Sequence, residues 1–423
     1  MTPRAGTRAG AVRAAARLAC AAVLMGGVPL GTSLIAGVPL DSAGQPPSAK
    51  PAPARTAPQK AAPKPRAAPR AADFDRLVLA ADEARQASRW EEAIDLYAKA
   101  VAIRPDYVEG FWYQGTSYYS LDNFAKGAEA FRRVVRLAPK NGAAYAFLGL
   151  CEFGLKQYDR SLEHLLQSRI LGVGDTKELG SVARYHAALL MTRMEQFEQA
   201  LETLGEFAAE GDDNPRVIEA MGLATLRMPL LPVEAPPDRR EMVLMAGRAS
   251  YMMATRNTAA SAKAFEALVA RYSEIPNVHY AYGVFLLLEE PDKAIEEFKR
   301  ELELQPSHAW SLMQIAFEYL KRGDGKAALP YAQQAAAAAP NAFPSYKALG
   351  QALLETGDVD GAIAQLETGI KLAPDSPGLH FMIARAYQRA GRTDDATRAR
   401  EEFTRLDRLA RTQRSGAQSV GGR

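Results

Sequence analysis

Proline and alanine recur at a fixed interval of 34 residues along this 423-residue chain. The interval separates Pro306, Pro340 and Pro374, and it also separates Pro105 from Pro139. It recurs in a set of alanines at Ala294, Ala328, Ala362 and Ala396. A period of this length indicates repeated units that bury their apolar faces only against their neighbours. The sequence therefore predicts an array of repeats and not a fold around one central core.

Residues 108–141 show what one unit contains. Steps of three and four residues place one set of side chains on a single helix face: Phe111, Gly115 and Tyr118. The turn-forming residues 121–123 interrupt this pattern. A second helix follows and stops before Pro139, since proline disfavours helix in the residue that precedes it. Each unit is thus predicted to be a helix, a turn and a second helix, with Gly115 and Gly127 where two helices cross closely.

The pattern resembles the tetratricopeptide repeat family, whose units carry Leu-Gly and Tyr in the first helix and Ala, a large apolar residue and Pro in the second. One unit fills these places with Tyr346, Leu349, Gly350, Leu353, Ala362, Leu366, Gly369 and Pro374. Units near Phe74, Val108, Ala309, Phe343 and Pro377 fit well, and units near Gly142, Ser181 and Ile275 fit less well. The resemblance covers about residues 74–410. It implies an all-α, right-handed superhelical solenoid of antiparallel helix pairs with a concave groove.

The first 44 residues have the charge order of an export signal. Four arginines at positions 4, 8, 13 and 17 precede an uncharged run at 18–40. That run exceeds the roughly 20 residues that cross a bilayer. A cleaved signal peptide, a retained membrane anchor and an unstructured leader of a cytoplasmic protein all stay open. We expect the array to be exported, either periplasmic or anchored by this segment.

Residues 45–72 form a linker with eight Pro, ten Ala, six Lys or Arg and no acid. Dense proline and like charges favour an extended spacer, although a disordered connector has the same composition. Residues 1–72 carry a net charge of +9, from ten basic residues and one acid, so the remaining chain carries −6. A mildly acidic array lacks the basic stripe of a nucleic-acid surface, and no nucleic-acid partner is expected.

The array carries no recognisable catalytic motif. Cys151 is its only cysteine, and its five histidines fall in different units without metal-ligand spacing. The glycines at 172–174 lack the order of a phosphate-binding loop and fit a loop between repeats. We therefore expect no enzyme, no metal site and no cofactor.

A binding function is predicted for the groove, which this family lines with side chains of the first helices. The resemblance selects Trp112, Thr116, Tyr119, Leu150, Phe153, Trp310, Met313, Phe317, Lys347, Gln351, Phe381, Arg385 and Gln388. Aromatic side chains on a rigid wall are typical anchors for a bound peptide or helix. The alternative is that several of these aromatics fill the superhelix interior without a ligand.

Residues 228–240 interrupt the array with a proline-rich, apolar loop. It packs across the outer face, enters the groove as an internal peptide, or offers a site to a partner. The predicted organisation is a leader (1–44), a linker (45–72), a first array (73–227), the loop (228–240), a second array with a cap helix from Thr393 (241–411) and a disordered tail (412–423). The expected function is a non-catalytic scaffold or assembly factor of the cell envelope that binds another protein. A recruiting subunit of an enzyme carried on another chain and a cytoplasmic adaptor are the alternatives.

Overall fold

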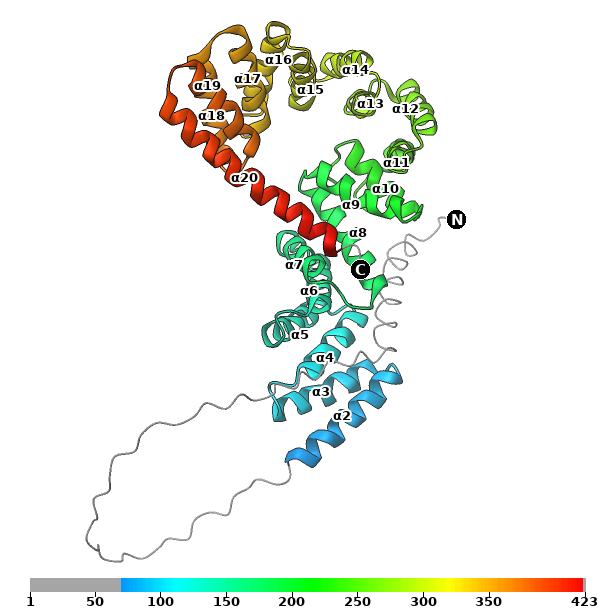
Figure 1. Cartoon of the computed structure of the whole chain (residues 1–423). Helices are drawn as coiled ribbons and strands as arrows, with labels where there is room; N and C mark the ends of the chain where they lie inside the picture. The colour runs from blue at the N-terminus through cyan, green and yellow to red at the C-terminus, as the bar shows by residue number, and fades with distance from the viewer. Residues whose placement is uncertain (1–69, 421–423) are drawn as a thin grey trace, which may run out of the picture. The chain divides into compact units, whose positions relative to one another are not determined.

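The computed structural model describes residues 70–420. The predicted leader and nearly all of the predicted linker lie outside these residues. Within them the secondary structure consists of helices, without a strand, which confirms the predicted all-α class (Figure 1). No helix in this part of the chain is both long and apolar enough to span a bilayer. The helices fall into two compact units, and the chain passes from the first to the second between Leu190 and Met191 inside α8.

The first unit is a stack of helix pairs. It contains α2 (Arg70–Gln86), α3 (Trp90–Ile103), α4 (Val108–Ser120), α5 (Phe124–Leu137), α6 (Gly142–Gly154), α7 (Tyr158–Leu171) and most of α8 (Lys177–Arg193). Each helix packs on the next one along the chain from α2 to α7. The core of this unit is therefore a series of neighbouring interfaces, as the repeat predicts.

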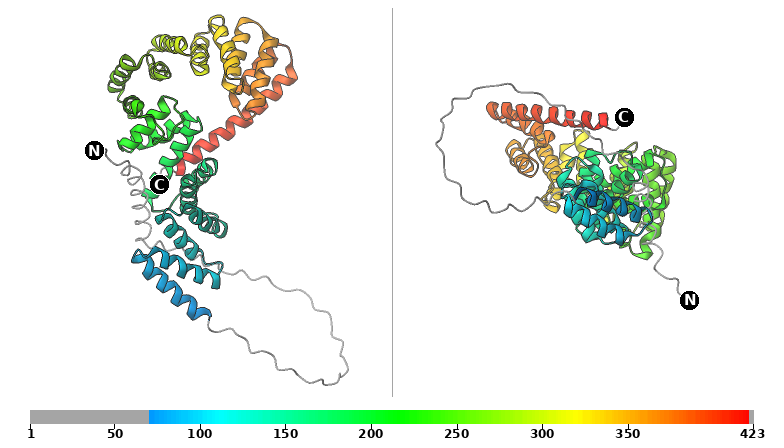
Figure 2. Two further views of the ribbon diagram at one scale, coloured as in Figure 1. Left: turned by 180° about the vertical axis from the view of Figure 1, so that it is seen from behind. Right: turned by 90° about the horizontal axis from the view of Figure 1, so that it is seen from below.

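The second unit continues the same pattern. It contains α9 (Phe197–Ala209), α10 (Pro215–Thr225), η1 (Pro237–Arg239), α11 (Arg240–Ala254), α12 (Thr258–Tyr272), α13 (Val278–Leu286), α14 (Pro291–Leu304), α15 (Ala309–Lys321), α16 (Gly325–Ala338), α17 (Phe343–Thr356), α18 (Val359–Leu372), α19 (Pro377–Arg389) and α20 (Thr393–Val420). Figures 1 and 2 show α11, α13 and α15 along the inner side of a curved stack, with α12, α14 and α16 outside.

The turn inside each pair has a fixed backbone geometry. A residue with positive φ follows the first helix at Ser88, Asp122 and Lys156, and glycine takes this place at Gly323, Gly357 and Gly391. Both series keep the interval of 34 residues. Glycine adopts this left-handed conformation without the steric cost that other residues carry. An Asn or Asp often caps the second helix, as when Asn123 Oδ1 accepts a hydrogen bond from the Lys126 amide.

Small residues allow the two helices of a pair to approach. A Cβ added at Gly115 would lie 2.8 Å from Phe131 Cζ, and one at Gly350 would lie 2.5 Å from Leu366 Cγ. Gly149 faces Leu165 in the same way at 2.7 Å. The predicted close crossing at Gly115 is confirmed by this contact.

One helix lacks a second helix of its own. The loop 228–240 follows α10, and α11 comes after the loop. α10 packs closely on α11. A Cβ at Gly222 would lie 1.8 Å from the Val243 carbonyl oxygen, and one at Gly247 would lie 1.9 Å from the Ile218 carbonyl oxygen. The two backbones thus touch across paired glycines. This direct contact replaces the helix that the repeat would otherwise supply.

The loop 228–240 lies within the second unit and is partly buried there. Leu231 and Ala235 are buried, whereas Val233 is exposed. Arg193 donates a hydrogen bond to the Pro229 carbonyl oxygen at 2.8 Å and lies 3.7 Å from the Glu234 carboxylate. The loop is therefore held by both its apolar side chains and its backbone.

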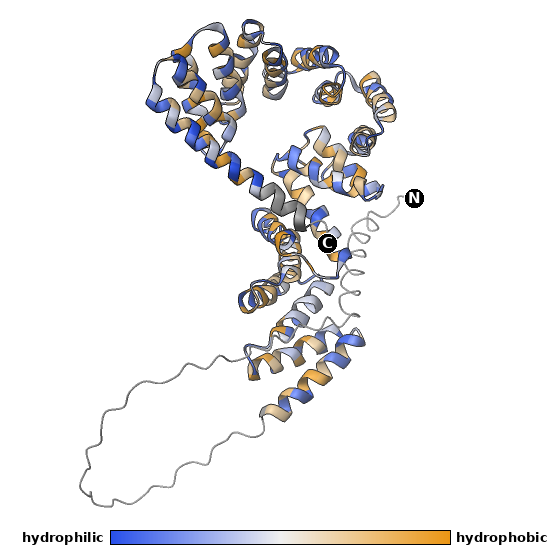
Figure 3. Cartoon of the chain, in the orientation of Figure 1, coloured by the Kyte–Doolittle hydropathy of each residue, from blue (hydrophilic) through white to orange (hydrophobic). Residues whose placement is uncertain are grey.

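The final helix extends further than the sequence predicts. The expected cap ended near Arg411 with a disordered tail at 412–423, but α20 continues to Val420. No proline interrupts this stretch, and its single glycine, Gly416, costs a helix only about 1 kcal/mol. Most of the helix is hydrophilic, as a terminal repeat requires (Figure 3).

Candidate partner-binding site

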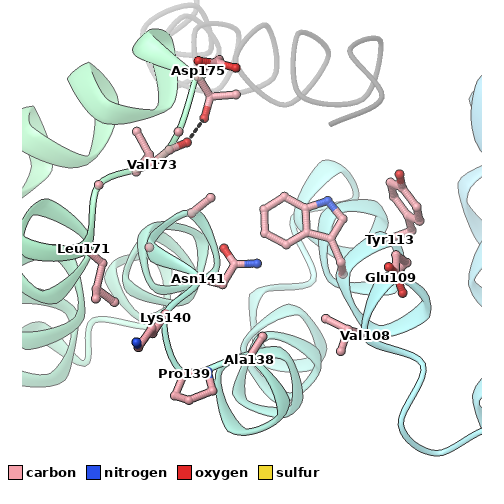
Figure 4. Close-up of a pocket in the computed structure, with 16 residues that line it drawn as sticks. Val108, Glu109, Tyr113, Ala138, Pro139, Lys140, Asn141, Leu171, Val173 and Asp175 are labelled. Atoms are coloured by element: carbon pink, nitrogen blue, oxygen red, sulfur yellow. Dashed lines mark hydrogen bonds between the residues drawn. The ribbon is translucent and has the colours of Figure 1, made fainter. Parts of the chain in front are cut away.

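The first unit contains a hollow of about 720 Å³ beside Trp112, which we call the Trp112 hollow. Its lining comes from the start of α4 (residues 108–113, in part), the turn into α6 (138–143) and the turn into α8 (171–176). Figure 4 shows these segments around the opening, with the Asn141 side chain directed into it. Three successive repeats of the first unit thus contribute one edge each to the same space.

Trp112 is fixed by aromatic contacts on its buried side. Its ring meets Phe131 at 5.7 Å and Phe147 at 5.6 Å between centroids, both edge to face. Phe131 and Phe147 in turn stack with their centroids 5.2 Å apart. Trp112 remains only half-buried, so part of a rigidly held indole faces the hollow.

Glycines shape the far wall of the hollow. A Cβ at Gly142 would lie 1.9 Å from the Gly172 carbonyl oxygen, so the turn 171–176 rests directly on the start of α6. Gly172 and Gly174 have positive φ values of 76° and 66°. The Thr176 hydroxyl donates to the Val173 carbonyl oxygen at 2.6 Å and closes the turn (Figure 4). The glycines at 172–174 thus form the inter-repeat loop that the sequence favours.

The charge on the walls is nearly balanced. Glu109 and Asp175 oppose Lys140 among the lining residues. Glu109 lies in the first turn of α4, and Asp175 precedes α8, where acidic groups offset the positive helix N-termini. Asn141 Oδ1 accepts a hydrogen bond from the Ala144 amide and caps α6. Apolar and aromatic surface therefore dominates the lining of this hollow.

The second predicted tryptophan anchor has a different environment. The Arg227 guanidinium carbon lies 4.5 Å from the Trp310 ring centre, 4.6 Å from Phe197 and 5.5 Å from Tyr280. Arg227 also donates a 2.6 Å hydrogen bond to the Glu198 carboxylate. Its side chain is only 9% exposed. A cation of the chain itself therefore occupies the aromatic surface that the sequence offers to a partner.

The other predicted groove residues divide by burial. Thr116, Tyr119, Leu150 and Met313 are buried; Trp112, Phe153, Trp310, Phe317, Lys347 and Gln351 are partly buried; Phe381, Arg385 and Gln388 are exposed. The Tyr119 ring packs edge to face on Phe124 and Phe147, so this side chain lies in the interior and not on an open groove wall. Phe153 packs on His186 with ring centres 4.8 Å apart. The structure brings Trp112 to a hollow and places Trp310 at Arg227.

Arg227 is the residue that sequence reasoning missed. It lies where the pattern predicts only the end of a helix, directly before the proline-rich loop. Its partners come from α9, α13 and α15, far from it in sequence. A repeat pattern reflects contacts between neighbouring repeats. It carries no signal for the contacts that Arg227 makes with distant repeats.

Two histidines pair with buried carboxylates. His164 Nδ1 lies 2.6 Å from Glu152 Oε2, and the Arg132 guanidinium donates to Glu152 Oε1 at 3.0 Å. Burial alone would raise the pKa of Glu152, but the hydrogen bonds from His164 and Arg132 outweigh it and hold that pKa below its ordinary value. His279 Nδ1 likewise lies 2.6 Å from Glu297 Oε2. The described residues contain no cluster of three or more His, Cys, Asp or Glu suited to a metal ion.

Models of the tetratricopeptide repeat match most of the array. One matches residues 78–137, 113–171 and 247–309, and another matches residues 319–377 and 353–399. The chain belongs to the tetratricopeptide repeat family. Proteins of this family form scaffolds for protein–protein interaction, and this chain is a protein-interaction scaffold.

The chain is also similar to solved structures of MamA proteins. "MamA 41-end from Desulfovibrio magneticus RS-1" is 23% identical over 41% of this chain and 97% of that one, with a TM-score of 0.36. "Crystal structure of MamA" is 18% identical over 39% of this chain and 96% of that one, with a TM-score of 0.36. No curated protein matches the sequence.

Proposed function

We propose that this protein is a non-catalytic scaffold of the cell envelope that binds a segment of a partner protein in the Trp112 hollow. The observation that supports it is a rigidly held, half-buried tryptophan beside an apolar space of about 720 Å³. Binding pockets span about 300–1,000 Å³, so this space admits a few side chains of a peptide. Trp112 is the expected anchor, because buried tryptophans dominate many interfaces.

The envelope location is supported by the sequence of the leader. Arginines at its start and the uncharged run at 18–40 follow the order of exported proteins. The absence of a catalytic motif from the sequence supports a scaffold rather than an enzyme.

Site-directed photo-crosslinking tests the binding site. A photo-reactive amino acid at Lys140, which is exposed on the rim, should capture the partner in cells of the protein's own organism. The same group at Arg160, exposed on α7 outside the lining, is the matched control. Trp112→Ala should abolish the crosslink from position 140 while the protein stays folded. Equal crosslinking from both positions would remove the support for this site.

A further inference from the structure

We propose that residues 45–69 of this same chain occupy the Trp112 hollow. This inference rests on the proposed function, because it also takes the hollow to be a site for an extended peptide. It differs in the occupant, which is an internal segment and not a partner. A partner would then bind by displacing that segment.

At the start of α2 the chain packs on Tyr107, the residue that precedes the lining of the hollow. In the first turns of α2, the Phe74 ring meets the Tyr107 ring with centroids 5.0 Å apart. The Arg104 guanidinium covers the same Phe74 ring at 4.1 Å. Tyr107 directly precedes Val108, which lines the hollow. An extended chain advances about 3.1 Å per residue, so five residues before Arg70 reach about 15 Å. The segment that ends at residue 69 therefore joins the first unit next to the residues that start α4.

The composition of this segment suits an apolar, aromatic-lined site. Residues 45–69 contain eight prolines and no acid. Proline-rich segments dock in aromatic grooves because their extended backbone loses little entropy on binding. The hollow offers the indole of Trp112 together with Pro139, Leu171 and Val173. Prolines of the segment can cover these groups without leaving backbone N–H donors unpaired.

The second unit shows how this chain uses a groove tryptophan. There Arg227 stacks on Trp310 and is held by a carboxylate at Glu198. In the part of the chain that the structure describes, no arginine or lysine is stacked on Trp112. Residues 45–69 supply five basic side chains: Lys50, Arg55, Lys60, Lys64 and Arg66. Glu109 and Asp175 provide carboxylates at the hollow, as Glu198 does beside Trp310.

Tethering makes a weak contact sufficient. A segment joined to its site by a short linker has an effective concentration in the millimolar range. Since the walls are nearly neutral, stacking and apolar contact carry the interaction and long-range attraction contributes little. The segment thus shields Trp112 until a partner with higher affinity arrives.

Fluorine NMR of the full-length protein tests this proposal. The chain has three tryptophans, so 5-fluorotryptophan gives three signals, and the signal missing in Trp112→Phe belongs to Trp112. The comparison is with a full-length variant in which residues 45–69 are replaced by Gly and Ser in equal number. The Trp112 signal should move in that variant, while the signals of Trp90 and Trp310 stay in place. A synthetic peptide of residues 45–69, added to the variant, should return the Trp112 signal toward its original position.

The outcomes separate this inference from the proposed function. An unchanged Trp112 signal in the variant overturns the inference. If the crosslink from position 140 still captures a partner in that case, the proposed function stands. A Trp112 shift that disappears on dilution assigns the segment to a second copy of the chain and also overturns the intramolecular proposal. Substituting the five basic residues of the peptide by Gln should weaken its binding about tenfold or more, and unchanged binding would remove the cationic part of the argument.

Discussion

Arg227 stacks on Trp310 at 4.5 Å, although α10 and α15 are separated along the chain by two complete helix pairs. The solenoid principle places most contacts between neighbouring units. This contact, with those to Phe197 and Tyr280, joins α9 and α10 to the inner side of α13 and α15. Arg227 therefore couples α9 and α10 to repeats that lie further along the chain.

Removing this side chain should destabilise the second unit. Arg227→Gly deletes the aromatic contacts, each of which contributes up to about 2 kcal/mol when desolvated. The same change relieves a left-handed backbone with φ of 50°. Lys156→Gly is the matched control, since Lys156 has φ of 59° and an exposed side chain. Thermal melting should show a lower free energy of unfolding for Arg227→Gly. For Lys156→Gly the free energy of unfolding should rise by up to about 1 kcal/mol. Equal gains would show that the aromatic contacts contribute nothing.

The two groove tryptophans should respond differently to truncation. Trp310→Ala leaves Arg227 without its nearest indole and should lower the free energy of unfolding by about 3 kcal/mol. Trp112→Ala removes a half-buried ring and should cost less, while partner binding falls by about 2 kcal/mol. Calorimetry and binding measured on both variants check this contrast. A larger loss of stability for Trp112→Ala would make that ring part of the core.

The pairing of α10 with α11 depends on glycine. At Gly222 a Cβ would lie 1.8 Å from a backbone oxygen, which side-chain movement cannot relieve. Gly222→Ala should therefore force the helices apart and cost at least about 1–3 kcal/mol. Gly205→Ala in α9 is the control, because its Cβ would lie 4.0 Å from the Ala254 Cβ. That substitution should stabilise the helix by about 1 kcal/mol in denaturant unfolding. Similar effects of both changes would contradict the close crossing.

Much of this architecture could be predicted from the sequence, because the contacts that define it are made within a helix or between adjacent helices. Pro139, Gly115 and the turn after Ser120 act on their own or adjacent helices, so a 34-residue period encodes them. The degraded units could not be resolved in the same way. The α10–α11 contact depends on Gly222 and Gly247, which lie outside the family pattern. Arg227 and the walls of the Trp112 hollow depend on contacts among several units, and a single-unit pattern does not record them.

Glu152 should make stability depend on acid. Its folded pKa lies below its ordinary value because of hydrogen bonds from His164 and Arg132. A carboxyl group whose pKa is lowered by folding stabilises the protein at pH values above its pKa in the unfolded chain, about 4.3. This contribution is lost as the pH falls through the pKa of the folded state. Urea unfolding of wild type and Glu152→Gln between pH 7 and pH 3 tests this. The difference between them should shrink as the pH falls, and a constant difference would exclude the linkage.

Location can be tested independently of binding. If residues 1–44 direct export, a reporter that is active only outside the cytoplasm should work when fused after Arg70. Replacing Arg4, Arg8, Arg13 and Arg17 by Gln should reduce or reverse this, because basic residues hold the start of such a segment in the cytoplasm. A fusion that begins at Gln45 is the control and should be inactive. Activity solely from a cytoplasmic reporter would instead favour an adaptor inside the cell, and the Trp112 hollow would then meet cytoplasmic partners.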